Sequence, residues 1–215
     1  MTIQTVVSAK SLWFGDVRQL NPRGINLYRL IVPLAQQWFG FTPPTEFDEE
    51  KGVRFSGGEF SPSGHGGDTI GIDITIYNNG IMATSTTNTD DTDLFIDLVL
   101  ARLAKEGVVT YRPEMFRKKQ YASEIVTHFD KQLAIPAFDR VCQLLSRFAY
   151  SSTLHFATGG LVFDTDPTMP GRQAPFRFER RVGASLSENL YYSHGPLKTN
   201  DHIAVLEAIE EALPA

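Results

Sequence analysis

Residues 54–68 read RFSGGEFSPSGHGGD and combine five glycines with three side chains that could bind a ligand, Glu59, His65 and Asp68. A Walker-type phosphate loop needs a lysine for the phosphate charge, a hydroxyl for magnesium and a helix directly afterwards. His65 stands where the lysine would be, and a strand pattern follows, which also excludes a dinucleotide-binding fingerprint. We therefore predict a flexible loop at 56–68 in which Glu59 and His65 are available to bind a partner or ligand.

Three carboxylates at the end of one predicted strand and on the next could form a metal site: Asp164, Asp166 and Glu179. A two-metal hydrolase brings such carboxylates together to bind magnesium and adds a positive group that supports the attacking water. Nucleases of this kind place a lysine two residues after the glutamate, but here Arg180 and Arg181 follow Glu179, and arginine is a poor general base. Charge pairing of Glu179 with a neighbouring arginine explains the same residues.

Tyr191, Tyr192 and His194 fall in a predicted non-helical connection just before the last helix. Aromatic side chains with polar tips suit a protein interface or a ligand platform. The same residues could instead pack back onto a sheet with their hydroxyls reaching water. We keep all three as candidate binding residues and leave both interpretations open.

The single cysteine, Cys142, excludes an intrachain disulfide and indicates a reducing compartment, so we predict a cytoplasmic protein. It lies in a helical pattern with Phe138, Val141, Leu145 and Phe148 on one apolar face. This face predicts a helix packed on the core with Cys142 as a buried thiol rather than a nucleophile. The sequence contains no G-x-S-x-G motif that would nominate a catalytic serine.

Four helices are predicted from apolar residues recurring every three to four positions. Their ranges are about 24–39, 87–107, 137–150 and 197–215. In the second helix the pattern places Leu94, Phe95, Leu98 and Ala101 on the buried face.

Six strands are predicted, the strongest at 68–77, where four isoleucines alternate with other residues. The ranges are 51–60, 68–77, 81–87, 120–130, 153–166 and 174–182. Asn79 and Gly80 predict a hairpin with a type I′ turn after the isoleucine strand. We find no sequence repeat and predict one α+β domain over 1–215. It would have an antiparallel sheet of about five to six strands with about four helices, mainly packed on one face.

Composition supports a soluble globular protein, with 42% hydrophobic and 21% charged residues in 215 and a formal net charge of −5. The N-terminal residues do not resemble a secretory signal, and the apolar runs fall far short of the ~20 residues that a membrane span needs. The acidic balance makes nucleic acid a minor alternative. It would act through five basic residues: Arg117, Lys118, Lys119, Arg180 and Arg181.

These observations favour a non-enzymatic interaction or assembly protein, a subunit of a larger complex that binds a protein partner or itself. No catalytic residue, metal or cofactor belongs to this prediction. A metal-dependent hydrolase, nuclease- or phosphoesterase-like, that uses Asp164, Asp166 and Glu179 is the first alternative. A domain that binds a small ligand in a pocket between the sheet and the helices is the second.

Overall fold

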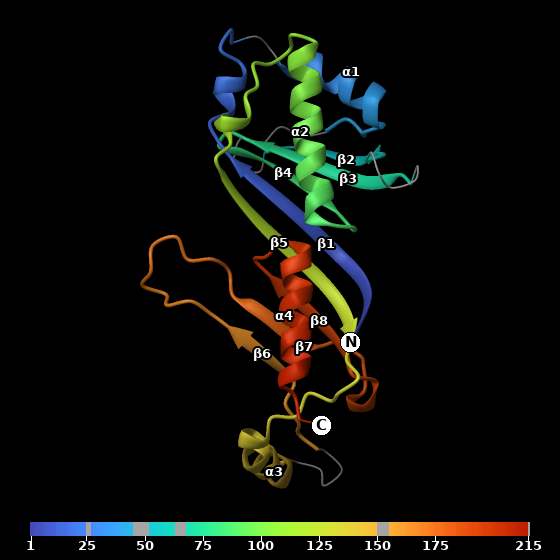
Figure 1. Ribbon diagram of the computed structural model, residues 1–215, viewed down its shortest axis with the longest axis vertical. Helices are drawn as coiled ribbons and strands as arrows, with labels where there is room; N and C mark the ends of the chain where they lie inside the picture. The colour runs from blue at the N-terminus through green and yellow to red at the C-terminus, as the bar shows by residue number, and fades with distance from the viewer. Residues whose placement is uncertain (25–26, 45–51, 63–67, 150–154, 215) are drawn as a thin grey trace. The chain divides into compact units, whose positions relative to one another are not determined.

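The computed structural model describes residues 1–24, 27–44, 52–62, 68–149 and 155–214 (Figure 1). Within these ranges the strands are β1 Thr2–Phe14, β2 Val53–Phe60, β3 Ile70–Tyr77, β4 Gly80–Ser85, β5 Lys118–His128, β6 Gly160–Phe163, β7 Phe176–Arg180 and β8 Leu190–Gly195. The helices are α1 Leu27–Phe39, α2 Thr89–Lys105, α3 Asp139–Phe148 and α4 Thr199–Ala212. The α+β class and the four helices are confirmed. The prediction of five to six strands is wrong, because the sheet has eight and includes the unpredicted β1 and β8.

The order of elements repeats along the chain. A strand, a helix, three strands and a second helix form β1-α1-β2-β3-β4-α2, and the same series forms β5-α3-β6-β7-β8-α4. The sheet order is β2-β3-β4-β1-β5-β8-β7-β6, so the two series are also arranged alike when read outward from β1 and β5. Although the residues show no repeat, the topology does, and this repeat is typical of a duplicated unit.

The chain divides into two compact units, and each is described by itself. The N-terminal unit comprises Val7–Ser123 and Leu197–Thr199, and the C-terminal unit comprises Met1–Val6, Glu124–Pro196 and Asn200–Ala215. That the whole chain folds as a single domain stays a prediction. None of the described helices is both long and apolar enough to cross a membrane.

The core of the N-terminal unit is built around Phe95 of α2, which is fully buried. Its ring centroid lies 5.1 Å from that of Phe39, 6.0 Å from that of Phe41 and 5.0 Å from that of Phe60. Helix α2 lies across β4 in this unit (Figure 1). The predicted isoleucine strand is confirmed as β3, whose first three alternate isoleucines are buried.

The buried stripe of α2 differs from the predicted one. Leu94 and Leu98 are 44% and 40% exposed, whereas Ile96, Leu100 and Leu103 are buried. The helix is therefore rotated about its axis relative to the prediction, because several spacings of three and four residues fit its leucine-rich sequence equally well.

The hairpin predicted after the isoleucine strand is confirmed, and its turn type is wrong. Strands β3 and β4 pair antiparallel up to Tyr77 opposite Gly80. Among the described residues other than glycine, only Asn189 has a positive φ, so Asn78 and Asn79 do not form a type I′ turn. Gly80 instead permits a close approach of strands, since a Cβ there would lie 2.6 Å from the carbonyl oxygen of Trp13.

The glycine-rich segment begins as a strand. Residues 56–60 belong to β2, and 63–67 lie outside the described residues. The pairing of β2 with β3 shifts register between Phe55 and Gly58, and Gly57 has a φ of 68° at that irregularity. A Cβ on Gly58 would lie 2.3 Å from the ring of Phe41. Gly57 thus allows the irregularity in the strand pairing, and Gly58 leaves room for the Phe41 ring.

The Gly58→Ala protein is expected to lose about 1–3 kcal/mol of unfolding free energy, because the added methyl group overpacks the site beneath Phe41. Gly71 provides the control, since a Cβ there meets no atom within 4 Å and its φ is not positive. Gly71→Ala should change stability by less than about 0.5 kcal/mol. Urea denaturation of both proteins measures the difference, and equal midpoints would show that Phe41 does not constrain Gly58.

The C-terminal unit has its own aromatic core. The rings of Phe129 and Phe178 stack at 4.9 Å between centroids, and those of Phe178 and Tyr191 at 4.7 Å. The backbone N–H of Leu133 donates to the Tyr191 hydroxyl over 2.9 Å. The buried hydroxyl of Tyr191 therefore has a hydrogen-bond partner inside the core. The connection predicted around Tyr191 is therefore the strand β8.

Candidate interaction surface

Helix α3 is strongly amphipathic, and its apolar side is exposed. Five large side chains, including Phe138 at the N-terminal cap position, are between 42% and 76% exposed. They are Phe138, Val141, Leu144, Leu145 and Phe148. The prediction that this side packs on the core is wrong, since no residue of α3 is buried. The predicted buried thiol of Cys142 is correspondingly part-exposed.

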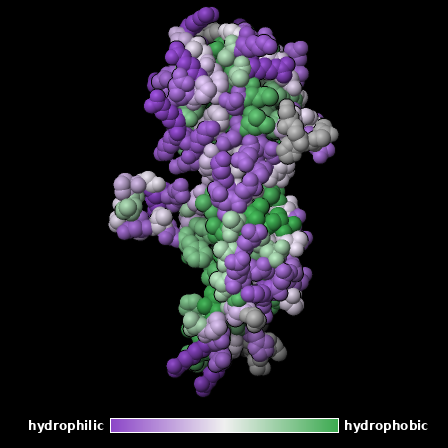
Figure 2. All heavy atoms as spheres, viewed as in Figure 1, coloured by the Kyte–Doolittle hydropathy of each residue, from purple (hydrophilic) through white to green (hydrophobic). Residues whose placement is uncertain are grey.

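Phe156 is a further exposed aromatic residue close to α3. Its backbone N–H donates to the Ser146 hydroxyl over 2.8 Å, which holds it beside α3, and its side chain is 49% exposed. We call the five residues named above the α3 apolar face. Large hydrophobic side chains gathered on one surface mark an interaction site far more often than single exposed ones do. Hydrophobic residues also occur among hydrophilic ones on the side of the molecule shown in Figure 2.

Two arginines, Arg140 and Arg147, lie along one edge of the α3 apolar face. Both are exposed, and neither forms an ion pair with any residue in the described ranges. The guanidinium of Arg147 lies 6.0 Å from the ring centroid of Phe148, at the edge of the face. Asp139 at the start of the helix is its one acidic residue. This edge of the surface is therefore basic, although the whole chain is acidic.

Three of the predicted site residues lie on one face of the sheet in the C-terminal unit. In the pairing of β7 with β8, Glu179 lies opposite Tyr192, and Arg177 lies opposite His194. The Tyr192 hydroxyl donates to Glu124 Oε2 over 2.7 Å. Side chains alternate between the faces of a strand, so Tyr191 points to the other face, where it is fully buried. Acidic, basic and aromatic groups are mixed on the exposed side.

In the Glu124→Gln protein the pKa of Tyr192 should be lower than in the unaltered protein. The pKa of Tyr192 is raised to about 12, first by burial and then by the hydrogen bond to Glu124 and the charge of Glu179. Because the folded protein favours the protonated phenol, this contribution to stability is present below the ordinary pKa of about 10 and is lost as the pH rises through about 12. With the Glu124 charge removed, the pKa should fall toward 10 without reaching it, since burial remains. Ring-carbon NMR of labelled tyrosine measures it, and an unchanged pKa would contradict the assignment.

Two of the three predicted metal-binding carboxylates, Asp164 and Asp166, have separate partners. Asp164 forms an ion pair with Arg172 in the connection between β6 and β7. Asp166 accepts hydrogen bonds from the hydroxyl and the N–H of Thr168 over 2.7 and 2.8 Å, which lower its pKa. Glu179 lies on β7. No three acidic, histidine or cysteine side chains in the described ranges are placed to hold a metal ion. The hydrolase stays a prediction without geometric support from these residues.

Glu59 lies at the surface of the N-terminal unit. It is exposed on β2 and lines two hollows of about 330 and 670 Å³. Gly57 lines both hollows as well. His65, predicted as its companion, lies outside the described residues. Binding by Glu59 stays a prediction.

Several of the five basic residues are engaged within their own units. The Lys118 and Lys119 ammonium groups lie 5.4 and 3.5 Å from the ring centroids of Phe14 and Trp13. Arg180 donates to the carbonyl oxygens of Ser185 and Leu186 and lies over the Tyr191 ring. Arg117 and Arg181 are exposed. Of the five predicted residues, Lys119 and Arg180 thus have contacts within their own units, and Arg117 and Arg181 are the two for which no such side-chain contact is described.

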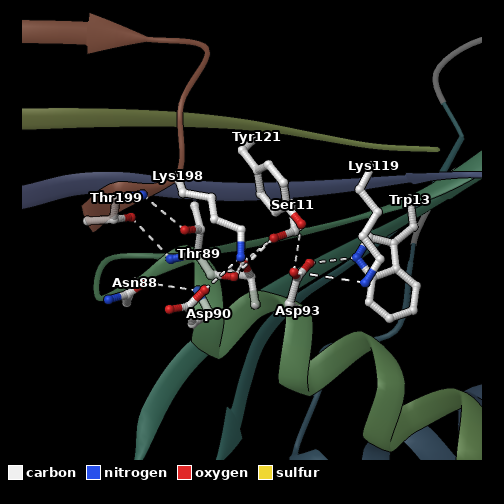
Figure 3. Close-up of polar contacts among 11 residues, drawn as sticks. Ser11, Trp13, Asn88, Thr89, Asp90, Asp93, Lys119, Tyr121, Lys198 and Thr199 are labelled. Carbon is white, nitrogen blue, oxygen red and sulfur yellow. Dashed lines mark hydrogen bonds and ion pairs between the residues drawn. The ribbon is translucent and has the colours of Figure 1, made fainter. Parts of the chain in front are cut away.

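Hydroxyl groups connect two helix starts in the N-terminal unit (Figure 3). The backbone N–H of Thr89 donates to Thr199 Oγ1 over 3.1 Å, and that of Thr199 donates to Thr89 Oγ1 over 3.0 Å. Each threonine is the first residue of the last helix in its topological repeat. Asn88 caps α2 by accepting from the N–H of Asp90 over 2.9 Å. The two helix starts, TNTDD and KTND, share a threonine as the first helical residue and an aspartate two positions later.

Asp93 is the centre of a polar cluster beside this connection (Figure 3). It accepts from Trp13 Nε1 over 2.6 Å and from the Tyr121 hydroxyl over 2.9 Å. The Lys119 ammonium lies 4.0 Å from Asp93 Oδ2. Burial and the hydrogen bond to Asp93 raise the pKa of Tyr121, so its phenol stays protonated near neutral pH and acts as a donor, not as a base. The cluster anchors α2 on β1 and β5.

Comparison with known proteins identifies no family. No protein-family model matches the chain, and no curated protein does. Among solved structures, the chain is similar to Methanococcus jannaschii TBP, with a TM-score of 0.47, 13% sequence identity, and coverage of 98% of this chain and 97% of that chain. A similarity this weak establishes neither a family nor a function.

Proposed function

We propose that this chain is a non-enzymatic interaction protein that binds a partner protein through the α3 apolar face. The observation that carries the proposal is the exposure of that face, from 42% at Leu144 to 76% at Phe148. An amphipathic helix normally gains its stability by burying its apolar side. In α3 no residue is buried by the described chain, so a second surface is needed to cover it.

The rim of the face indicates the chemistry of the partner. Arg140 and Arg147 stand seven positions apart, two helical turns, and neither is ion-paired with a described residue. Charges at the edge of an interface guide association and fix the register more than they add affinity. We therefore expect the partner to present an apolar stripe, such as one side of an amphipathic helix, edged by carboxylates.

An interaction role fits the described geometry better than the predicted hydrolase or binding of nucleic acid. Two carboxylates of the predicted hydrolase, Asp164 and Asp166, interact with Arg172 and Thr168 rather than with each other. A nucleic-acid surface would need basic groups that are free to meet phosphates. Lys119 and Arg180 instead contact aromatic rings and backbone carbonyls within their own units.

The mass of the native protein in an extract of its own cells tests this proposal. The free chain has a mass of 24.0 kDa. Sizing of the untagged protein at its natural abundance should show an assembly whose mass exceeds 24.0 kDa by that of a second kind of chain. A monomer at every concentration would contradict the proposal. A mass that is only a multiple of 24.0 kDa would also contradict it, because the face would then serve self-association.

A further inference from the structure

The N-terminal unit contains an apolar cavity, partly open to the surface, that neither its packing nor the proposed partner explains. Its volume is about 170 Å³, and each of the side chains that line it is apolar. Helices α1 and α2 supply one wall, including Ala35, Trp38 and Val99. Strands β2, β3 and β4 supply the opposite wall, including Phe55, Ile74 and Ile81. The α3 apolar face belongs to the other unit, so the two features are independent.

The size of this cavity is unusual for a folded core. Protein interiors are packed as densely as organic crystals, and voids larger than a water molecule are few. Water does not fill a space of this kind favourably, because a buried water needs two to four polar partners. Apolar cavities of about 150 Å³ in other proteins stay dry and bind benzene. A hydrocarbon group would recover the van der Waals contacts that the lining otherwise lacks.

Helix α1 is the weaker wall of this cavity. Pro33 lies inside α1 and cannot donate a backbone hydrogen bond, which weakens the helix beside Ile31 and Ala35 of the lining. At the far end of α1, the Arg102 guanidinium lies 4.1 Å from the ring centroid of Trp38 and connects α1 to α2 on the outside. The wall is thus fixed at its C-terminal end and weakened in its middle.

We infer that the N-terminal unit binds an uncharged hydrocarbon group of about the size of one six-membered ring, between the sheet and α1 and α2. The group is either a free molecule or the end of a longer one. A charged group is excluded, because no polar side chain in the lining could compensate for its desolvation.

NMR of isoleucine methyl groups, with toluene as the probe and benzoate as a charged probe of similar size, tests this inference. Toluene should saturably shift the methyl signals of Ile74 and Ile81 and raise the melting temperature, while benzoate should do neither. Signals from Ile125, which is buried in the C-terminal unit, should stay in place. Unshifted lining methyls near the solubility limit of toluene would overturn the inference, as would equal shifts in both units or equal effects of the two probes.

The Ala35→Leu protein adds three carbons to the cavity wall and should bind toluene at least tenfold more weakly. Val162→Leu changes an exposed residue of β6 and should leave toluene binding unchanged. If Ala35→Leu does not fold, the comparison of toluene with benzoate on the unaltered protein still decides the matter. Toluene binding that is equally strong in a folded Ala35→Leu protein would place the ligand elsewhere and overturn the inference. None of these outcomes depends on whether a partner covers α3.

Discussion

The Phe178→Ala protein is expected to lose about 3–5 kcal/mol of unfolding free energy. Phe178 is fully buried against Phe129 and Tyr191, with ring centroids 4.9 and 4.7 Å away. Truncation removes its transfer free energy and leaves a cavity beside the rings of Phe129, which follows β5, and Tyr191 of β8. Urea denaturation followed by far-UV circular dichroism measures the loss.

Phe148 is the matched control for this experiment. It belongs to the same unit and has the same side chain, but it is 76% exposed on α3. Phe148→Ala should change the unfolding free energy of the isolated chain by less than about 0.5 kcal/mol. A large loss in Phe148→Ala would show that α3 packs on its own chain, which would remove the basis of the proposed interaction.

The Leu145→Glu protein is expected to bind its partner about 100-fold or more weakly. Leu145 lies in the middle of the α3 apolar face and is 46% exposed in the free chain. Residues at the centre of an interface dominate its affinity, and a carboxylate buried there without a counter-charge adds its desolvation cost. In a native extract, sizing should therefore find the variant at 24.0 kDa.

Gln143→Glu introduces the same charge on the opposite side of α3. Gln143 is exposed and lies outside the α3 apolar face, so this variant should stay in the assembly. Circular dichroism should show both variants folded, since neither position is buried. Equal retention of Leu145→Glu and Gln143→Glu in the assembly would show that the partner binds elsewhere.

Strands with polar residues on their buried faces were not recognisable from the sequence. On β1 the buried positions are Ala9, Ser11 and Trp13, and Ser11 is satisfied by the hydroxyl of Thr92 over 2.7 Å. On β8 they include Ser193, whose hydroxyl lies 2.7 Å from His202 Nε2. A sequence shows the alternation of apolar and polar residues but not the partner that makes a buried serine acceptable. For this reason the isoleucine strand β3 was predicted and these two strands were not.

For helix α3 the sequence pattern predicted the element but not what its apolar side contacts. Its apolar spacing, from Val141 to Phe148, correctly predicted a helix at this position. The same spacing could not distinguish a face that packs on its own sheet from a face that is covered by another molecule, because both need apolar residues at the same positions. For the same reason, Cys142 was predicted to be buried and is part-exposed. Tyr192, His194 and Glu179 were selected for their chemical types, and only the pairing of β7 with β8 shows that they share one face.

The most direct test of the proposed interaction is photo-crosslinking from α3 inside the cells that make the protein. A benzophenone side chain at position 145 should give one discrete adduct with a second kind of chain, while the same group at position 143, on the opposite side of the helix, should give none. The adduct should vanish when Val141→Glu is added, since Val141 lies one turn away on the same face. Absence of any adduct at 145, or the same adduct from 143 and 145, would contradict the account.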